Sequence, residues 1–107
     1  MTPSQMRKRF IVEFGRGIAI VWPVLSIIVF TMIVLGFLSA RLEDWPFGMG
    51  LYFALITGFT VGYGDLVPHQ PLVRACAVVI AFLGIVMTAI IAAVAVKALT
   101  AAQESAK

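Results

Sequence analysis

Six consecutive residues, Thr60 to Asp65, read TVGYGD and carry the most unusual chemistry in the chain. They stand between apolar runs, yet two glycines and an acid are unfavourable both in the core of a soluble protein and in a lipid-facing helix. Backbone carbonyls are strong dipoles, and a row of them facing one axis can replace the hydration shell of a cation. Such a row needs positive φ at some positions, which Gly62 and Gly64 adopt without steric cost. The stretch therefore predicts cation binding by main-chain oxygens, with the Thr60 hydroxyl at the deep end.

The composition predicts a membrane protein. The chain has 107 residues, of which 62% are hydrophobic and only 12% are charged, and its mean hydropathy is +1.06. Soluble domains usually have roughly a quarter of their residues charged, so this chain lacks the charge to coat a globule in water. Its length allows one small domain.

Two apolar runs, 17–38 and 72–96, are long enough to cross a bilayer, which takes about 20 helical residues. A third run, 46–59, is too short to cross and is typical of a re-entrant helix, with Pro46 suited to its first turn. Non-helical backbone inside the hydrocarbon region of a membrane is stable only when it is buried in protein or lines a water-filled cavity. We therefore predict one pore domain, divided as follows: basic interfacial segment 1–16, outer helix 17–40, pore helix 46–59, filter 60–65, inner helix 72–99 and cytoplasmic tail 100–107.

The distribution of basic residues predicts the orientation. Only Arg41 and Arg74 of the eight Lys and Arg residues lie between the two spans. The positive-inside rule then places both termini in the cytoplasm. We predict a multi-pass protein of the plasma membrane. Anionic lipids of the inner leaflet would attract the basic residues that precede the first span, although a loosely ordered tail is an equal alternative. Those residues are Arg7, Lys8, Arg9 and Arg16.

The stretch TGFTVGYGDLVP, flanked by two spans, resembles the small two-transmembrane bacterial potassium channels, whose filter loops carry TVGYG. The resemblance implies a homotetramer, in which four loops supply the oxygens at each level of the pore. It also implies that the only bound groups are K⁺ ions, with no organic cofactor. The implied filter residues are Thr60, Val61, Gly62, Tyr63 and Gly64, with K⁺ held by the carbonyls of the first four and the Thr60 hydroxyl.

The same resemblance implies that Asp65 braces the filter and adds negative potential at the outer mouth. This chain has Ile56 where some relatives carry a glutamate partner for that aspartate, and Phe53 where many carry a tryptophan. Tyr52 can donate a hydrogen bond, and Thr57 matches the family. We therefore expect the filter to be braced differently, with Tyr52 and Thr57 as the candidate residues and Thr57 as a possible partner for the Tyr63 region.

In the second span, Gly84 matches the hinge glycine of the family's inner helices, and close helix packing is an equal alternative for it. Thr88, Ala92 and Val96 follow at helical spacing and form a stripe that could face the inner cavity and gate.

The predicted fold class is therefore an all-α membrane protein with two transmembrane helices, a re-entrant pore helix and a filter loop, assembled as a fourfold tetramer. The predicted function is passive, potassium-selective conduction. A nonselective cation channel, an accessory subunit and the excised pore of a larger channel remain alternatives. One His, one Cys and scattered acids form no nucleophile–base pair or metal-ligand spacing, so we expect no enzyme activity. No nucleic-acid partner is expected.

Overall fold

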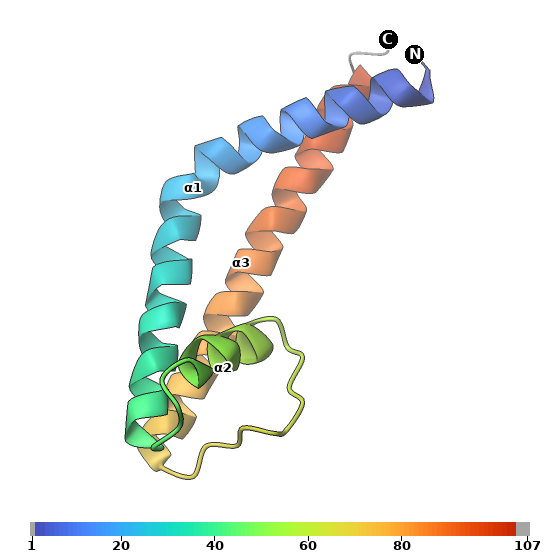
Figure 1. Cartoon of the computed structure of the whole chain (residues 1–107). Coiled ribbons are helices and arrows are strands. Elements are labelled where there is room, and N and C mark those ends of the chain that lie inside the picture. Colours follow the sequence, from blue (N-terminus) through green and yellow to red (C-terminus); the bar gives the residue numbers. More distant parts are fainter. Residues whose placement is uncertain (1, 105–107) are drawn as a thin grey trace. The chain divides into compact units, whose positions relative to one another are not determined.

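The computed structural model describes residues 2–104, which form three helices and, within that range, no strand. The helices are α1 (Pro3–Leu42), α2 (Met49–Gly58) and α3 (Pro71–Glu104), as Figure 1 shows. Helices α1 and α3 are long and apolar enough to cross a membrane. In the most apolar 18-residue stretch of each helix, only 17% of α1 and 22% of α3 is buried, whereas the core helix of a soluble protein would be mostly buried. The helices therefore have the properties of membrane spans.

The described chain forms two compact units. The terminal unit combines α1 up to Leu25 with α3 from Ala89 onward, and the central unit runs from Ser26 to Thr88. The filter motif lies in the central unit.

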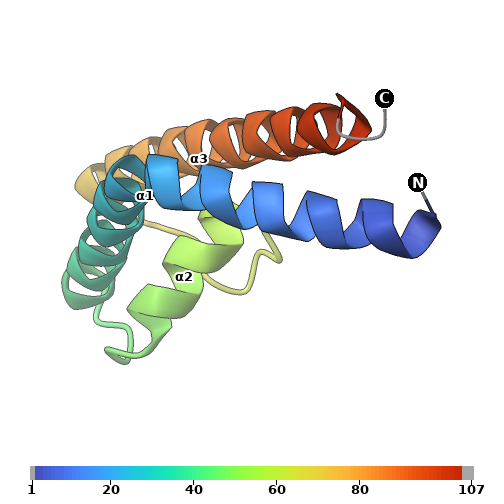
Figure 2. The same cartoon turned by 90° about the horizontal axis from the view of Figure 1, so that it is seen from above.

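In the terminal unit, the first part of α1 runs beside the last part of α3 (Figure 2). Gly17 allows this approach, because a Cβ atom at that position would lie 2.6 Å from Cγ1 of Val94. Ala98 and Ala102 are buried on the same side of α3. Small residues at these positions let the two helix backbones come close together.

Both long helices extend beyond the bounds expected from the sequence. The basic segment is the start of α1 itself, from Pro3 onward, and the helix continues through Pro23. Proline suits a first helical turn, and Glu13 pairs along the helix with Arg9 at 3.8 Å and with Arg16 at 3.5 Å. Residues 100–104 of the expected tail are helical, and residues 105–107 lie outside the described part of the chain.

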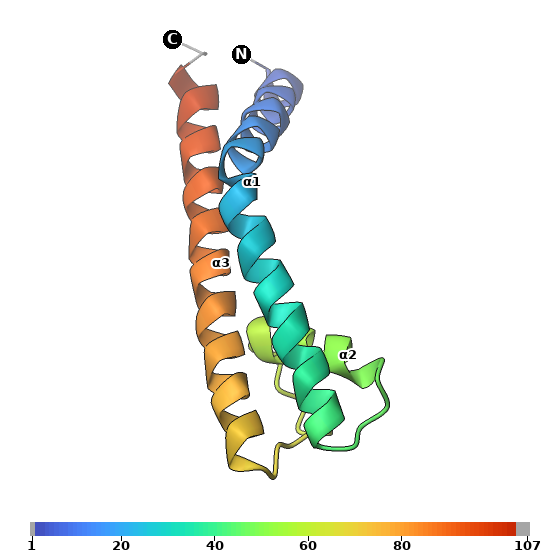
Figure 3. The same ribbon diagram turned by 90° about the vertical axis from the view of Figure 1, so that its left-hand side faces the viewer.

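In the central unit, α2 packs against the second part of α1 and the first part of α3 (Figure 3). Two glycine pairs make these contacts. A Cβ atom on Gly50 would lie 2.7 Å from the carbonyl oxygen of Gly36 in α1, and one on Gly84 would lie 2.6 Å from Cα of Gly58. Backbone therefore meets backbone at both crossings, and at the first of them the side chains of Ala54 and Phe37 also lie close to the glycines.

Helix α2 is shorter than the expected pore helix. It begins at Met49, and Pro46 lies in a preceding turn in which its carbonyl accepts the Met49 N–H at 2.9 Å. The ring of Phe47 in this turn stacks on Phe37, with centroids 4.4 Å apart. Its 10 residues make α2 about 15 Å long, again too short to cross a bilayer.

Candidate functional site

The loop that leaves α2 is tied to the end of that helix by its own N–H groups. The N–H of Thr60 donates to the Thr57 carbonyl at 3.2 Å. The N–H groups of Val61 and Gly62 both donate to the Ile56 carbonyl, at 2.8 and 3.1 Å. The first residues of the filter motif are thus anchored to the last turn of α2.

These bonds determine the direction of two carbonyls. In a planar trans peptide, the C=O of one residue points opposite to the N–H of the next. Because the N–H groups of Val61 and Gly62 face Ile56, the carbonyls of Thr60 and Val61 point away from the end of α2. Their oxygens remain available for a ligand that lies beyond the loop.

The backbone angles of the loop agree in part with the sequence analysis. Gly62 and Gly64 have φ values of 56° and 87°, positive as expected. Thr60 also has a positive φ, of 61°, whereas the sequence predicted positive φ only for the glycines. A β-branched residue in this region is strained, by roughly 1–3 kcal/mol. The Thr60 hydroxyl donates to the Phe59 carbonyl at 2.6 Å and so presents only its lone pairs elsewhere.

Tyr52 on α2 reaches the expected partner. Its hydroxyl donates to Oδ2 of Asp65 at 2.8 Å, and Oδ1 of the same carboxylate accepts the Leu66 N–H at 3.1 Å. Thr57, the other expected brace, meets the loop through its carbonyl. The structure therefore joins α2 to the far end of the motif through the tyrosine.

Replacing Tyr52 by phenylalanine should loosen the outer end of the loop. The lost hydrogen bond is charge-assisted, because its acceptor is a carboxylate, although solvent exposure weakens it. We expect the current to decay faster during sustained opening. The matched control is Asp65→Asn alone and combined with Tyr52→Phe, since two residues that act as a pair are not additive. Additive effects on the decay rate would contradict the brace.

Tyr63 and Val61 project from the chain. Tyr63 is 72% exposed and Val61 is 49% exposed. Within one chain, much of the surface of both side chains is therefore left uncovered.

A carboxylate that sequence analysis did not single out joins the ends of the loop region. Glu43, just after α1, accepts the N–H groups of His69 and Gln70 at 2.8 and 2.7 Å, immediately before α3 begins at Pro71. Its side chain is only 5% exposed, and the His69 ring lies 3.5 Å away. An acid after the first span, and unpaired N–H groups expected at the start of the next helix, were the sequence signal for this contact. Sequence analysis missed it because 26 residues separate Glu43 from His69.

The pKa of Glu43 is lowered from its ordinary value of 4.5, chiefly by the hydrogen bond from Gln70 and also by that from His69, against the opposing effect of burial. A lowered pKa stabilises the fold above the ordinary value, and this contribution is lost as the pH falls through the folded-state pKa. We expect Glu43→Gln to lower the unfolding temperature at pH 7. The difference from wild type should shrink as the pH falls below about 4.5, and parallel pH profiles would contradict this role.

The expected gate residues lie on α3. Gly84 is buried in the central unit, and the Thr88 hydroxyl donates to its carbonyl at 2.8 Å. In the terminal unit, Ala92 and Val96 are exposed. The close contact of Gly84 with Gly58 favours the packing interpretation of this glycine over the hinge.

Two long apolar helices, with a short helix and an exposed loop with outward-pointing carbonyls between them in the chain, are the architecture expected of a pore-forming membrane protein. The sequence model described as "Ion channel" matches residues 18–101, so the chain belongs to this ion channel family. The chain is also similar to the TWiK family of potassium channels protein 18 of Caenorhabditis elegans, with 36% identity over 53 residues. That match covers 50% of this chain and 10% of the relative. No solved structure matches the chain.

Proposed function

We propose that the chain forms a potassium-selective channel that conducts K⁺ passively across the plasma membrane. The observation that carries the proposal is the backbone of the loop after α2. Its Thr60 and Val61 carbonyls point away from the helix, and Gly62 and Gly64 have the positive φ that such a row of oxygens needs. The similarity to a protein named as a potassium channel supports potassium as the ion.

The proposed sites use the carbonyls of Thr60, Val61, Gly62 and Tyr63, with the Thr60 hydroxyl and with Gly64 completing the loop. One chain supplies one oxygen at each level, so a cage around a dehydrated ion needs four copies. The homotetramer is proposed from this need for four oxygens at each level, and Val78 and Phe82 of α3, 70% and 64% exposed, offer apolar surface that lipid or another copy would cover. Conduction requires sites that bind the ion well enough to replace its water yet release it to the next site.

The proposed orientation has both termini in the cytoplasm and the loop region 43–70 outside. The basic count on either side of the spans supports it. In the terminal unit, the Pro3 end of α1 and the Glu104 end of α3 also point the same way (Figure 2). Anionic lipid of the inner leaflet would surround Arg7, Lys8 and their neighbours on α1.

The test is the reversal potential of the purified protein in planar bilayers with K⁺ on one side and Na⁺ on the other. We expect a value near the potassium equilibrium potential. A value near zero would overturn the proposed selectivity and favour a nonselective cation channel. Current that appears only with a second channel subunit would favour an accessory subunit instead.

A further inference from the structure

Glu43 and His69, at the two ends of the loop region, form a pair that the proposed filter does not use. Nδ1 of His69 lies 3.5 Å from Oε2 of Glu43, farther than the roughly 2.7–3.2 Å of an ordinary N–H···O hydrogen bond. The Glu43 side chain is only 5% exposed, whereas that of His69 is 81% exposed. A buried carboxylate oxygen therefore faces one nitrogen of an imidazole that solvent can reach.

The two oxygens of Glu43 have different partners. Oε1 accepts the N–H groups of His69 and Gln70, at 2.8 and 2.7 Å, and these bonds hold the carboxylate in place. Oε2 is left facing the imidazole. The same bonds fix the backbone of His69 relative to the carboxylate, so the two side chains are positioned before any ligand arrives. Such preorganisation lowers the cost of binding.

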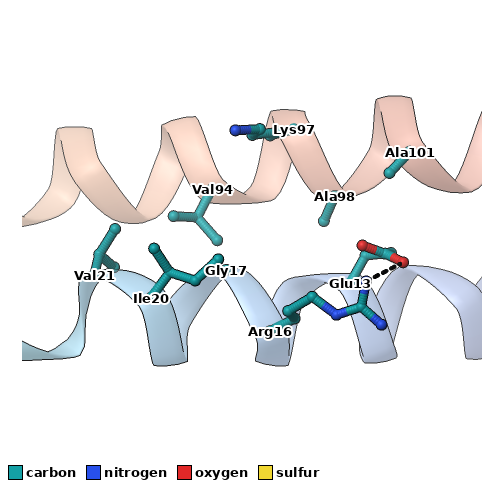
Figure 4. A pocket seen from close by; sticks show the side chains of 9 residues that line it. All are labelled: Glu13, Arg16, Gly17, Ile20, Val21, Val94, Lys97, Ala98 and Ala101. Atoms are coloured by element: carbon teal, nitrogen blue, oxygen red, sulfur yellow. Dashed lines mark ion pairs between the residues drawn. The ribbon is translucent and has the colours of Figure 1, made fainter.

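No other acid of the chain can form such a pair, because His69 is the only histidine in the sequence. Glu13, in the terminal unit, forms ion pairs with two arginines, and Figure 4 shows the one with Arg16. The single cysteine, Cys76, is buried. Glu43 is thus the acid that combines a fixed carboxylate with an accessible imidazole.

The spacing of this pair matches that of two ligands on one zinc ion. Zinc binds imidazole nitrogen at about 2.0–2.1 Å and carboxylate oxygen at about 2.0–2.2 Å, with tetrahedral geometry. Two such ligands lie about 3.4 Å apart, close to the 3.5 Å between Nδ1 and Oε2. Calcium and magnesium prefer oxygen ligands alone, so the imidazole favours zinc over them.

We propose that Glu43 and His69 form a zinc site, one in each chain. Oε2 and Nδ1 would supply two ligands and water the others, since the described residues contain no group of three or more His, Cys, Asp or Glu side chains that could hold a metal ion. Glu43 follows the end of α1 and His69 precedes the start of α3. A bound ion would therefore clamp together the ends of the segment that contains α2 and the filter loop. The site does not depend on potassium selectivity.

The first test is NMR spectroscopy of the tag-free protein in detergent, with ¹⁵N-labelled histidine. Because the chain has one histidine, one imidazole is observed. Zinc chloride added near neutral pH should shift the ¹⁵N resonance of Nδ1 more than that of Nε2, and magnesium chloride should shift neither. A larger shift of Nε2 would show an ordinary exposed histidine and overturn the site.

Variants then test the carboxylate. Glu43→Gln should weaken zinc binding at least about tenfold, since even residues that only support a metal ligand contribute that much. The matched control is Asp44→Asn, which removes the same charge from the next residue. Asp44 is exposed, and salt screens exposed charges, so this control should change the affinity less than about twofold. Equal losses in the two variants would show a general attraction to negative charge and contradict the proposal.

His69→Asn guards against a misfolded variant, because the largely exposed side chain can be replaced while its N–H still reaches Glu43. Zinc should raise the unfolding temperature of the wild type, since a ligand that binds the folded state stabilises it. The unfolding temperature of His69→Asn should not respond to zinc. An equal rise in both proteins would overturn the assignment of the site to this pair.

Discussion

Replacing Gly62 or Gly64 by alanine is expected to abolish potassium-selective conduction. The two residues have φ values of 56° and 87°, where a side chain is strained by roughly 1–2 kcal/mol per residue. In the proposed tetramer, four copies of the strained residue would turn the carbonyls from their positions around the pore. A Cβ atom at either glycine would meet nothing within 4 Å in a single chain. The expected effect therefore comes from the strained backbone. Within one chain, the added methyl group crowds no other atom.

The measurement is single-channel recording with K⁺ and Na⁺ on opposite sides of the bilayer. Gly48→Ala is the matched control, because Gly48 has a φ of −62° and equally open surroundings. The control should conduct like the wild type. Normal potassium-selective current through either filter variant would refute the assignment of this loop as the filter.

Replacing Gly84 by alanine is expected to destabilise the channel and remove its current. The new Cβ atom would lie 2.5 Å from the carbonyl carbon of Gly58 and 2.6 Å from its Cα. Backbone atoms cannot rotate aside as a side chain can, so α2 or α3 must shift. Overpacking of this kind typically costs about 1–3 kcal/mol. Because Gly58 precedes the anchored residues of the loop, the shift would also reach the filter.

Thermal unfolding of the detergent-solubilised protein, together with bilayer recording, checks this expectation. Gly15→Ala serves as the control, since a Cβ atom there meets nothing within 4 Å and alanine favours a helix. A Gly84→Ala protein that is as stable as wild type and changes only its open probability would support the hinge and contradict the packing role.

The long helices could be predicted because apolar runs of more than 20 residues carry their own signal. Their ends could not. The basic segment before the first run contains no proline after Pro3, and α1 starts there, although its charge suggested a separate interfacial element. The start of α2 was also misplaced: residues 46–48 form a turn in which Phe47 stacks on Phe37, a tertiary contact that local preference does not encode.

The filter loop was predictable only where residue type limits the backbone. Glycine made positive φ at positions 62 and 64 a sound expectation. The positive φ of Thr60 lies next to the N–H bonds to Ile56, and no preference of threonine indicates it. The sequence identified Tyr52 as a side chain near the filter that could donate a hydrogen bond, but its acceptor, Asp65, is known only from the structure. The Glu43 contacts join residues 26 positions apart, a pairing that periodicity cannot detect.

The two backbone crossings of α2 also determine how freely the gene can vary. Gly36, Gly50 and Gly84 each have a backbone atom so close that a Cβ atom would overlap it, whereas Gly48 has open space. In a saturation library selected for potassium uptake, the codons of the first three should remain glycine and that of Gly48 should diversify. Conservative exchange to alanine or serine would not rescue the first three, because backbone atoms cannot rotate aside to make room for a side chain. Tolerated substitutions should therefore accumulate at surface positions and not at the helix crossings.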